Sequence, residues 1–388
     1  MPGPEIFFSA GEISGDQHAA SLLNALRRVR PDLCAWGVGG PRLAASGQQQ
    51  SATIEQLSLV GITEVLPRLG SILALLRRLG RELERRRPAV VVLVDAPDFN
   101  LRLAAKAHAL GLRVVYFITP QIWAWRRGRL RDIRRNVNLA LCILPFEVPF
   151  FREAGVNAEY VGHPLVDLVR TSAPVAVLRN GFGLDPARPV IALLPGSRRS
   201  EIQHLMPALL GAAQLLAART PRPQFLVPAA SPTVRPLLAP LTGCNLETLI
   251  VEGRSWDCLA AADAAVVASG TATLETALIG TPFVVIYRIS AISHAIAHRL
   301  IHARWASLPN LLLGQPAVLE LLQHECRPET IAAEIERLLA DPSAAMRLRE
   351  KCGMVKALLG PGDTAARAAA AVAREAGWSL AGASASAL

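Results

Sequence analysis

The sequence predicts an α/β protein built from two Rossmann-like, doubly wound parallel-sheet domains that face each other across a cleft. Short strand-like runs rich in valine, isoleucine and leucine alternate with helical patterns of alanine, leucine and arginine, which is the order of βαβ units. This rhythm weakens over residues 171–189 and then restarts. The length of 388 residues and the hydrophobic content of 51% suit two domains with buried cores, and they exclude a disordered chain.

Domain boundaries follow from this rhythm and from the turn-forming pairs that interrupt it. We expect an N-terminal domain over residues 1–170, a linker over 171–189, a C-terminal domain over 190–360, and a C-terminal helix with a frayed tail over 361–388.

Hydrophobic periodicity places the elements of each domain. In the N-terminal domain we expect strands at Ile6–Ala10, Ala89–Val94, Val114–Ile118 and Glu159–Val161, and helices at Gln17–Val29, Leu66–Arg86 and Phe99–Leu110. In the C-terminal domain we expect strands at Val190–Leu194, Gln224–Val227, Ala264–Ala268 and Pro282–Tyr287, and a helix from about Ser200 to Arg219. Late helices are expected at Ile331–Leu339 and Ala365–Ala376.

Charge and cysteine usage narrow the class of protein. The net charge is +10, and only three of the 41 basic residues are lysines. Arginine binds carboxylates and phosphates with two hydrogen bonds, so we expect anionic ligands or an anionic membrane surface; an arginine-biased genome is the alternative. The six cysteines stand singly, which indicates reduced thiols in the cytosol. The chain opens directly into an apolar strand and has no long apolar run, so we expect neither a signal peptide nor a transmembrane helix.

In open parallel sheets, ligands bind beyond the carboxyl ends of the strands, so the loops after the strands are candidate sites. The loop from Ser9 to Asp16 contains two glycines that let a backbone approach a ligand, and it leads into a helix start that favours anions. Glu12 is a candidate for the reaction and Ser14 for acceptor binding. The alternative is a tight turn capped by Ser14 or Asp16.

A second carboxylate follows the most apolar strand. Asp95 comes after six consecutive apolar residues, where surroundings of low dielectric constant raise the pKa of a carboxyl group and suit a general base. Asp98 follows Pro97 at the start of the next helical pattern, and we expect it to cap that helix.

A phosphate-binding loop is expected after the first strand of the second half. Gly196 and Ser197 expose backbone N–H groups between a strand and a helix, and Arg198 adds a guanidinium for phosphate oxygens. The sequence has no DxD triplet, so we expect arginine and amides rather than a metal to hold a diphosphate. We expect no metal and no cofactor.

Two further loops supply candidates for binding the donor. Ser269, Gly270 and Thr271 lie between a strand and a helix, and Glu275 is placed to accept both hydroxyls of a ribose. A solvated helical glutamate is the alternative for Glu275. Asn310 lies in a proline-bounded loop, where it either binds a ligand or caps the next helix.

Aromatic residues and a histidine mark the acceptor side of the predicted cleft. Trp123 and Trp125 lie beside arginines in a loop after a strand, which suits a sugar or a nucleotide; packing between the domains is the alternative. His163 ends another strand, where a structural role is the alternative.

One apolar stretch, residues 53–79, ends in several arginines. Its later part predicts a helix whose apolar face enters a bilayer interface beside an anionic membrane surface. The alternative is an ordinary helix that faces the core and carries a solvated basic side.

Taken in order, these motifs resemble the lipid-A-disaccharide synthase family of Gram-negative bacteria. The matching stretches are AGEISGD (10–16), GITEVL (61–66), DAPDFN (95–100), TPQIWAWR (119–126), LPFE (144–147), VGHPLVD (161–167), LLPGSR (193–198), ASGTATLE (268–275) and SLPNLL (307–312).

The resemblance implies an inverting GT-B glycosyltransferase with its site in the cleft. It would condense UDP-2,3-diacylglucosamine with 2,3-diacylglucosamine 1-phosphate (lipid X) into the β-1,6-linked disaccharide 1-phosphate and release UDP, as a peripheral protein on the cytoplasmic face of the inner membrane. Chains of the family can pair, so a homodimer is a candidate; nucleic acid is not an expected partner.

The resemblance also assigns roles to single residues. Asp95 matches the family's proposed base, and Glu12 matches an acidic residue important for activity. Arg198 and Asn310 match positions implicated in UDP binding or catalysis. Glu275 as the ribose ligand follows from analogy with other GT-B enzymes.

Three other functions fit parts of the pattern. The nearest is another GT-B enzyme acting on UDP-sugars, either an N-acetylglucosaminyltransferase or an epimerase, which would turn over non-acylated UDP-N-acetylglucosamine. A non-catalytic basic protein would bind nucleic acid or membrane with strong salt dependence. A nicotinamide-dependent oxidoreductase is disfavoured because no GxGxxG follows the first strand.

Overall fold

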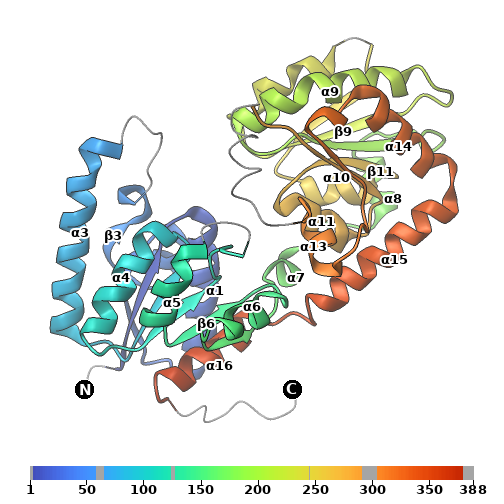
Figure 1. The fold of residues 1–388 in the computed structure, drawn as a ribbon. Helices are drawn as coiled ribbons and strands as arrows, with labels where there is room; N and C mark the ends of the chain where they lie inside the picture. The colour runs from blue at the N-terminus through green and yellow to red at the C-terminus, as the bar shows by residue number, and fades with distance from the viewer. Residues whose placement is uncertain (1–2, 58–64, 124–126, 244, 291–303, 379–388) are drawn as a thin grey trace. The chain divides into compact units, whose positions relative to one another are not determined.

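The computed structural model describes residues 3–57, 65–123, 127–243, 245–290 and 304–378. They form two α/β units; in Figure 1 the first is coloured blue to green, with its last helix in red, and the second green to orange-red. Unit 1 comprises Met1–Asp167 together with Pro361–Leu388, and unit 2 comprises Leu168–Gly360. Each unit contains its own parallel sheet, which confirms the predicted class of two doubly wound domains.

Unit 1 is built on a seven-stranded sheet with the order β3-β2-β1-β4-β5-β6-β7, and all its neighbours pair in parallel. Its strands are β1 (Glu5–Ala10), β2 (Cys34–Gly39), β3 (Gln49–Thr53), β4 (Val90–Val94), β5 (Val114–Phe117), β6 (Leu139–Cys142) and β7 (Ala158–Tyr160). Its helices are α1 (Ile13–Val29), α2 (Pro41–Ala45), α3 (Val65–Arg86), α4 (Pro97–Ala109), α5 (Leu130–Asn136), α6 (Glu147–Glu153), α7 (Leu165–Leu168) and α16 (Thr364–Glu375), where α7 runs to the boundary with unit 2.

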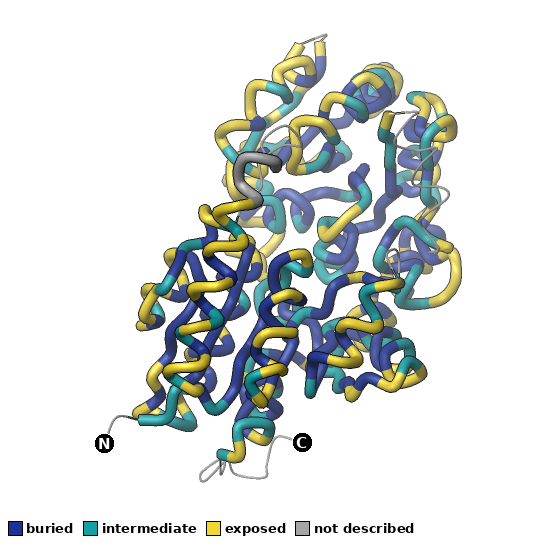
Figure 2. The backbone as a smooth tube through the Cα atoms, turned by 60° about the vertical axis from the view of Figure 1, so that its left-hand side comes forward, coloured by how far each residue is buried: buried dark blue, intermediate teal, exposed yellow. Residues whose placement is uncertain are grey.

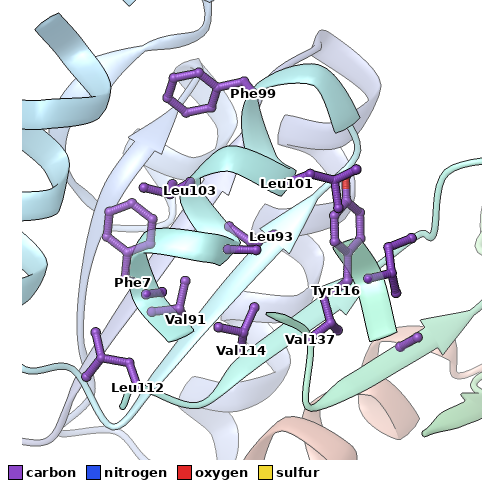
Figure 3. Close-up of a cluster of buried hydrophobic side chains, with 14 of the residues drawn as sticks. Phe7, Val91, Leu93, Phe99, Leu101, Leu103, Leu112, Val114, Tyr116 and Val137 are labelled. Atoms are coloured by element: carbon purple, nitrogen blue, oxygen red, sulfur yellow. The ribbon is translucent and has the colours of Figure 1, made fainter. Parts of the chain in front are cut away.

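Alternation along the strands divides the core of unit 1 into two layers. Val91 and Leu93 of β4 pack with α3, α4, α5 and α6, and Figure 3 shows this layer with Phe7 and Tyr116. Val90, Val92 and Val94 point to the opposite layer, which contains α1, α2 and α16. Since side chains alternate in a strand, β4 is buried on both faces, as its unbroken apolar run predicts. Figure 2 shows these central strands as buried and the outer faces of the helices as exposed.

Unit 2 repeats the plan with six parallel strands in the order β10-β9-β8-β11-β12-β13. The strands are β8 (Val190–Leu194), β9 (Gln224–Ala229), β10 (Thr248–Glu252), β11 (Ala264–Ala268), β12 (Phe283–Tyr287) and β13 (Glu320–Leu322). The helices are α8 (Val175–Gly181), α9 (Arg199–Ala217), α10 (Ser255–Ala261), α11 (Thr271–Ile279), α13 (Leu308–Leu313), α14 (Pro328–Ala340) and α15 (Pro342–Leu358). The 3-10 helices of unit 2 are Arg235–Thr242 and Gln323–Glu325, and those of unit 1 are Ile54–Gln56 and Arg127–Arg129.

Some strands lie outside the predicted set, and their sequences explain why. Strand β3 is polar and lies at a sheet edge, where one side of the strand has no neighbour. Strand β2 contains two glycines, which weaken a strand signal. Strand β13 is three residues long. Pairing with neighbours, rather than local propensity, forms these strands.

The expected linker, residues 171–189, contains helix α8 and belongs to unit 2. Helix α8 packs against α10, and its Arg179 pairs with Asp263 at 2.7 Å. The N–H and hydroxyl of Ser172 donate to Asp257 at 2.8 and 2.7 Å. Turn-forming residues here connect packed elements and do not mark a free segment.

The chain crosses from unit 2 back to unit 1 before its last helix. Helix α16 packs against α1 in unit 1, and Asp167 accepts hydrogen bonds from the N–H groups of Asp363 (2.7 Å) and Thr364 (3.0 Å) at its start. Asp167 therefore supplies the acceptors that a helix N-terminus requires from a position almost two hundred residues earlier.

The burial of residues 70–86 in helix α3 bears on the predicted membrane-facing stretch, residues 53–79. Leu75, Leu76, Leu79 and Leu83 are buried in the core, while Arg77 and Arg81 are exposed. This part is the core-facing helix with a solvated basic side that we gave as the alternative. Residues 58–64 of the segment lie outside the described residues. Within the described ranges, no helix combines the length and the apolar character needed to cross a membrane.

Asp167→Ala should loosen helix α16. The variant leaves the N–H groups of Asp363 and Thr364 without an acceptor, which costs about 1 kcal/mol for a helix cap. We expect faster amide hydrogen exchange in Thr364–Glu375 and a lower Tm. Asp132→Ala, at an exposed aspartate in α5, is the control. Unchanged exchange in α16 would contradict the role of Asp167.

Candidate active site

Two loops at the carboxyl edge of the unit 1 sheet lie in direct contact. A Cβ added to Gly11, after β1, would lie 2.2 Å from the Cβ of Ala96, after β4, so only glycine fits there. A Cβ added to Gly15 would lie 3.5 Å from the Cβ of Asp95. The two loops that the sequence singled out therefore meet, and Asp95 lies against the first turn of α1.

The backbone at Asp95 is strained and is held by a buried amide. Asp95 and Ala96 have φ values of 54° and 46°, in the left-handed region that residues other than glycine rarely adopt. The side-chain amide of Asn100 donates to the carbonyl of Asp95 at 2.7 Å, and the hydroxyl of Tyr116 donates to the same oxygen at 2.6 Å. The amide oxygen of Asn100 accepts from the Ser9 hydroxyl at 2.7 Å, which ties β1 to the same turn.

The environment of Asp95 suits proton acceptance. Burial raises the pKa of its carboxyl, and the charge of Glu12 raises it further, while the N–H of Ala96 acts in the opposite direction. Glu12 and Ser14 are exposed, and Glu12 is the N-cap residue of α1 without a side-chain capping bond. Glu12 therefore acts on Asp95 through its charge.

Two neighbouring aspartates, Asp16 and Asp98, have partners in other elements. Asp16 caps α2 instead of its own helix, accepting from the N–H groups of Gly40 (2.7 Å), Arg42 (2.9 Å) and Leu43 (3.1 Å). Asp98 lies in the first turn of α4, whose N-cap is Ala96, and it pairs with Arg129. The N-cap role predicted for Asp98 was wrong. Asp16, which we gave only as an alternative cap of its own helix, caps α2 instead.

Trp123 is anchored by a buried carboxyl group. Its indole N–H donates to Glu147 at 3.1 Å. Its ring packs edge to face against that of Phe146, with the ring centroids 4.9 Å apart. Glu147 is 1% exposed and also accepts from the N–H of Leu144 at 3.1 Å. Burial raises the pKa of Glu147 to about 7, and these donors oppose that shift. Trp125 lies outside the described residues.

His163 is a buried structural residue in this arrangement. Its Nδ1 accepts from the N–H of Leu165 at 3.2 Å. Burial, and then the nearby His18, lower its pKa to about 4, and burial lowers the pKa of His18 to about 4 as well. Both rings are therefore neutral at pH 7.

Unit 2 contains a cavity of about 540 Å³ at the carboxyl ends of the adjacent strands β10, β9, β8 and β11. Helices α9 and α11 begin at its wall, and helix N-termini favour anions. The lining includes every residue that the sequence assigned to donor binding except one; these are Gly196, Ser197, Arg198, Ser269, Gly270, Thr271 and Glu275.

The phosphate-loop candidates are partly engaged by a neighbouring carboxylate. Gly196 has a φ of 109°, which turns the loop toward the start of α9. Glu201 accepts from the N–H groups of Ser197 (3.2 Å) and Arg198 (3.3 Å), and from the guanidinium of Arg198 at 3.3 Å. The Arg198 side chain is nevertheless 79% exposed. An anion in the cavity would find the same donors that Glu201 uses.

Glu275 is half-buried in α11, and burial raises its pKa. The indole of Trp256 lies close enough to lower that pKa in part, although its buried N–H has no hydrogen-bond partner at normal geometry. Glu275 therefore faces the cavity beside an aromatic ring and is not the solvated helical residue of the alternative.

Asn310 lies outside the cavity lining and is 1% exposed. Its oxygen accepts from the N–H groups of Ala317 (2.8 Å) and Val318 (2.9 Å), and its amide donates to Val318 and Glu320. The structure therefore shows Asn310 with partners inside unit 2, and its direct contact with the donor stays a prediction.

Among the residues that the structure describes, no cluster of three or more histidine, cysteine, aspartate or glutamate side chains is arranged to hold a metal ion. Metal independence stays a prediction.

The model of the lipid-A-disaccharide synthetase family matches residues 6–373 of the chain. The chain belongs to this family. A lipid-A-disaccharide synthase of Myxococcus xanthus is 46% identical over 371 residues, covering 95% of this chain and 97% of the relative. One of Anaeromyxobacter dehalogenans is 47% identical, covering 88% of this chain and 89% of the relative. Membership of the lipid-A-disaccharide synthase family makes the chain a glycosyltransferase of lipid A biosynthesis.

Solved structures establish the GT-B fold for this member of the lipid-A-disaccharide synthase family. The calicheamicin glycosyltransferase CalG4 superposes with a TM-score of 0.61 at 17% identity, covering 97% of this chain and 99% of that chain. MurG of Acinetobacter baumannii superposes with a TM-score of 0.61 at 14% identity, covering 96% of this chain and 100% of that chain. A UDP-GlcNAc 2-epimerase of Neisseria meningitidis gives 0.58 at 11% identity, covering 96% and 99%. At these identities the likeness concerns the fold alone.

Sequence reasoning missed the residues that support the site of this lipid-A-disaccharide synthase family member. Asn100 and Glu147 both lie inside motifs that carried the family resemblance, so an unexplained polar residue in such a motif was the available signal. For Tyr116 the only indication in the sequence was its place in a predicted buried strand. Nothing in the sequence pointed to Glu320, because its partners come from α13 and the loop before it.

Glu147→Gln should change how stability depends on pH. The folded protein holds a proton at Glu147 up to about pH 7, whereas the usual pKa is 4.5, so wild-type stability falls as pH rises through this window. The glutamine of the variant does not titrate, so the Tm of the variant minus the Tm of the wild type should increase from pH 5 to pH 8. The corresponding change in the free energy of unfolding is about 2 kcal/mol. Glu153→Gln, at an exposed residue of the same helix, should show no such trend. A Tm difference independent of pH would refute the assignment.

Proposed function

We propose that the chain condenses UDP-2,3-diacylglucosamine with 2,3-diacylglucosamine 1-phosphate (lipid X). The product is the β-1,6-linked tetraacyl disaccharide 1-phosphate, and UDP leaves. Family membership supports the reaction class, and the observation that carries the assignment of roles is the half-buried Asp95 with its raised pKa beside the start of α1.

The acceptor chemistry belongs to unit 1 in this proposal. Asp95 takes the proton from the acceptor 6-hydroxyl as that oxygen forms a bond to the anomeric carbon of the donor. The donor is an α-glycoside and the product a β-glycoside, so a single displacement with inversion accounts for the change. Burial and then the charge of Glu12 keep the pKa of Asp95 raised. Ser14, Trp123 and His163 follow strands β1, β5 and β7 at the carboxyl edge of the same sheet.

The donor chemistry belongs to the cavity of unit 2. The C1–O bond to UDP breaks in the same step, and negative charge develops on the departing diphosphate. In this proposal Arg198, the N–H groups of the Gly196–Arg198 loop and the Ser269–Thr271 loop stabilise that charge, and Glu275 accepts from the ribose hydroxyls. All of them line the cavity, which supports these roles. Asn310 fixes the loop before β13 by accepting from the N–H groups of Ala317 and Val318.

We also propose peripheral association with an anionic surface on the cytoplasmic face of the inner membrane. Both substrates carry acyl chains, and the chain has a net charge of +10 and exposed arginines on α3. The proposal includes no nucleic-acid partner, and a homodimer stays a prediction.

Product analysis tests the reaction. Purified protein is mixed with both acylated substrates in detergent and EDTA, and the products are identified by mass spectrometry. We expect the tetraacyl disaccharide 1-phosphate and UDP, because arginine and amides supply the positive charge at the diphosphate. Product that appears only after magnesium is added would overturn metal independence, while turnover of non-acylated UDP-N-acetylglucosamine alone would favour an epimerase.

Asp95→Asn and Arg198→Ala should separate the two roles, and each serves as the other's control. Asp95→Asn keeps the shape but removes the base, so kcat should fall about 10²- to 10⁴-fold with an unchanged Kd for UDP. Arg198→Ala should raise the Kd for UDP about 10-fold or more, since it removes charge-assisted hydrogen bonds. A near-normal kcat in Asp95→Asn would show that another group is the base.

A further inference from the structure

Glu320, the first residue of the edge strand β13, accepts four hydrogen bonds, three from the segment that leads into α13 and one from the first turn of α13 itself. One carboxylate oxygen accepts from the N–H of Ser307 (2.9 Å), its hydroxyl (2.7 Å) and the amide of Asn310 (2.7 Å). The other accepts from the N–H of Ala306 at 2.8 Å. Neither Glu320 nor Ser307 lines the donor cavity.

The segment held by Glu320 is hydrogen-bonded to the donor loop. The hydroxyl of Ser269, which does line the cavity, donates to the carbonyl of Ala306 at 2.7 Å. That carbonyl belongs to the peptide whose N–H group, on Ser307, donates to Glu320. A single peptide unit therefore joins the carboxylate to the loop that precedes α11.

We propose that Glu320 is a positioning residue for donor binding, acting through the Ala306–Ser307 peptide and Ser269. The inference rests on the proposed donor site and deepens it.

A carboxylate is required at this position because all four partners are donors. An ionised carboxylate only accepts hydrogen bonds, and three of the four donors converge on one of its oxygens. A glutamine would turn an NH₂ group toward at least one N–H or O–H donor and leave it without an acceptor. Glu320→Gln therefore keeps the size of the side chain while releasing one end of the peptide that holds Ser269.

The test measures UDP binding by titration calorimetry and steady-state kinetics on the full chain. Glu320→Gln should raise the Kd for UDP and the KM for the UDP-sugar about 10-fold, leaving the KM for the acceptor and the pH profile of kcat unchanged. Ser307→Ala, which removes one donor from a fully buried residue, should raise both constants about 3-fold. The matched control is Glu334→Gln, because Glu334 is a buried carboxylate of the same unit that pairs with Arg337 away from the cavity.

A double-mutant cycle tests the route. If Glu320 acts through Ser269, the effects of Glu320→Gln and Ser269→Ala on the Kd for UDP should be clearly less than additive. Full additivity would overturn the route. Normal UDP binding and donor KM in Glu320→Gln, or in Ser307→Ala should the first variant fail to fold, would overturn the positioning role. Absence of UDP binding to the wild-type chain would instead overturn the donor site itself, and this inference with it.

Discussion

The carbonyl oxygen of Asp95 accepts hydrogen bonds from Asn100 and Tyr116, and the geometry of the unit 1 site depends on this pair. Two consecutive residues other than glycine adopt the left-handed conformation there, which costs on the order of 1 kcal/mol or more each. The two bonds offset that cost and turn the chain sharply at the end of β4. The turn brings the Asp95 side chain against the first turn of α1, within the electrostatic influence of Glu12.

The donor cavity depends on hydrogen bonds of the reverse kind: its loops present donors, and other parts of unit 2 supply the acceptors. Its loops expose N–H groups and an arginine, which need acceptors when no ligand is bound. Glu201 provides acceptors for the loop after β8, and the Ala306 carbonyl provides one for Ser269. Acceptors within the protein thus hold the donor groups in place, and Glu320 fixes the peptide that carries one of them.

Desolvation explains the shifted pKa values around unit 1's sheet edge. Burial disfavours the charged form of any group, so it raises the pKa of Asp95 and Glu147 and lowers that of His163. Glu147 accepts hydrogen bonds from Trp123 and from a backbone N–H group, and His163 accepts one from a backbone N–H group. Among these three residues, Asp95 is the one that combines a raised pKa with only partial burial, which suits it to exchange a proton with a substrate.

The sequence by itself determined the fold class, the central strands and the loops that carry Asp95 and Arg198. These features depend on local patterns, because alternating or continuous apolar runs mark strands, and a proline (Pro97) or a glycine (Gly196) after a strand marks a loop. The tertiary structure decided which partner each polar side chain has. Asp16 caps a different helix, Asn310 faces inward, and Ser9 meets Asn100 across 91 residues of chain. A hydrogen bond depends on which atoms folding brings within about 3 Å, and a local pattern contains no information about that distance.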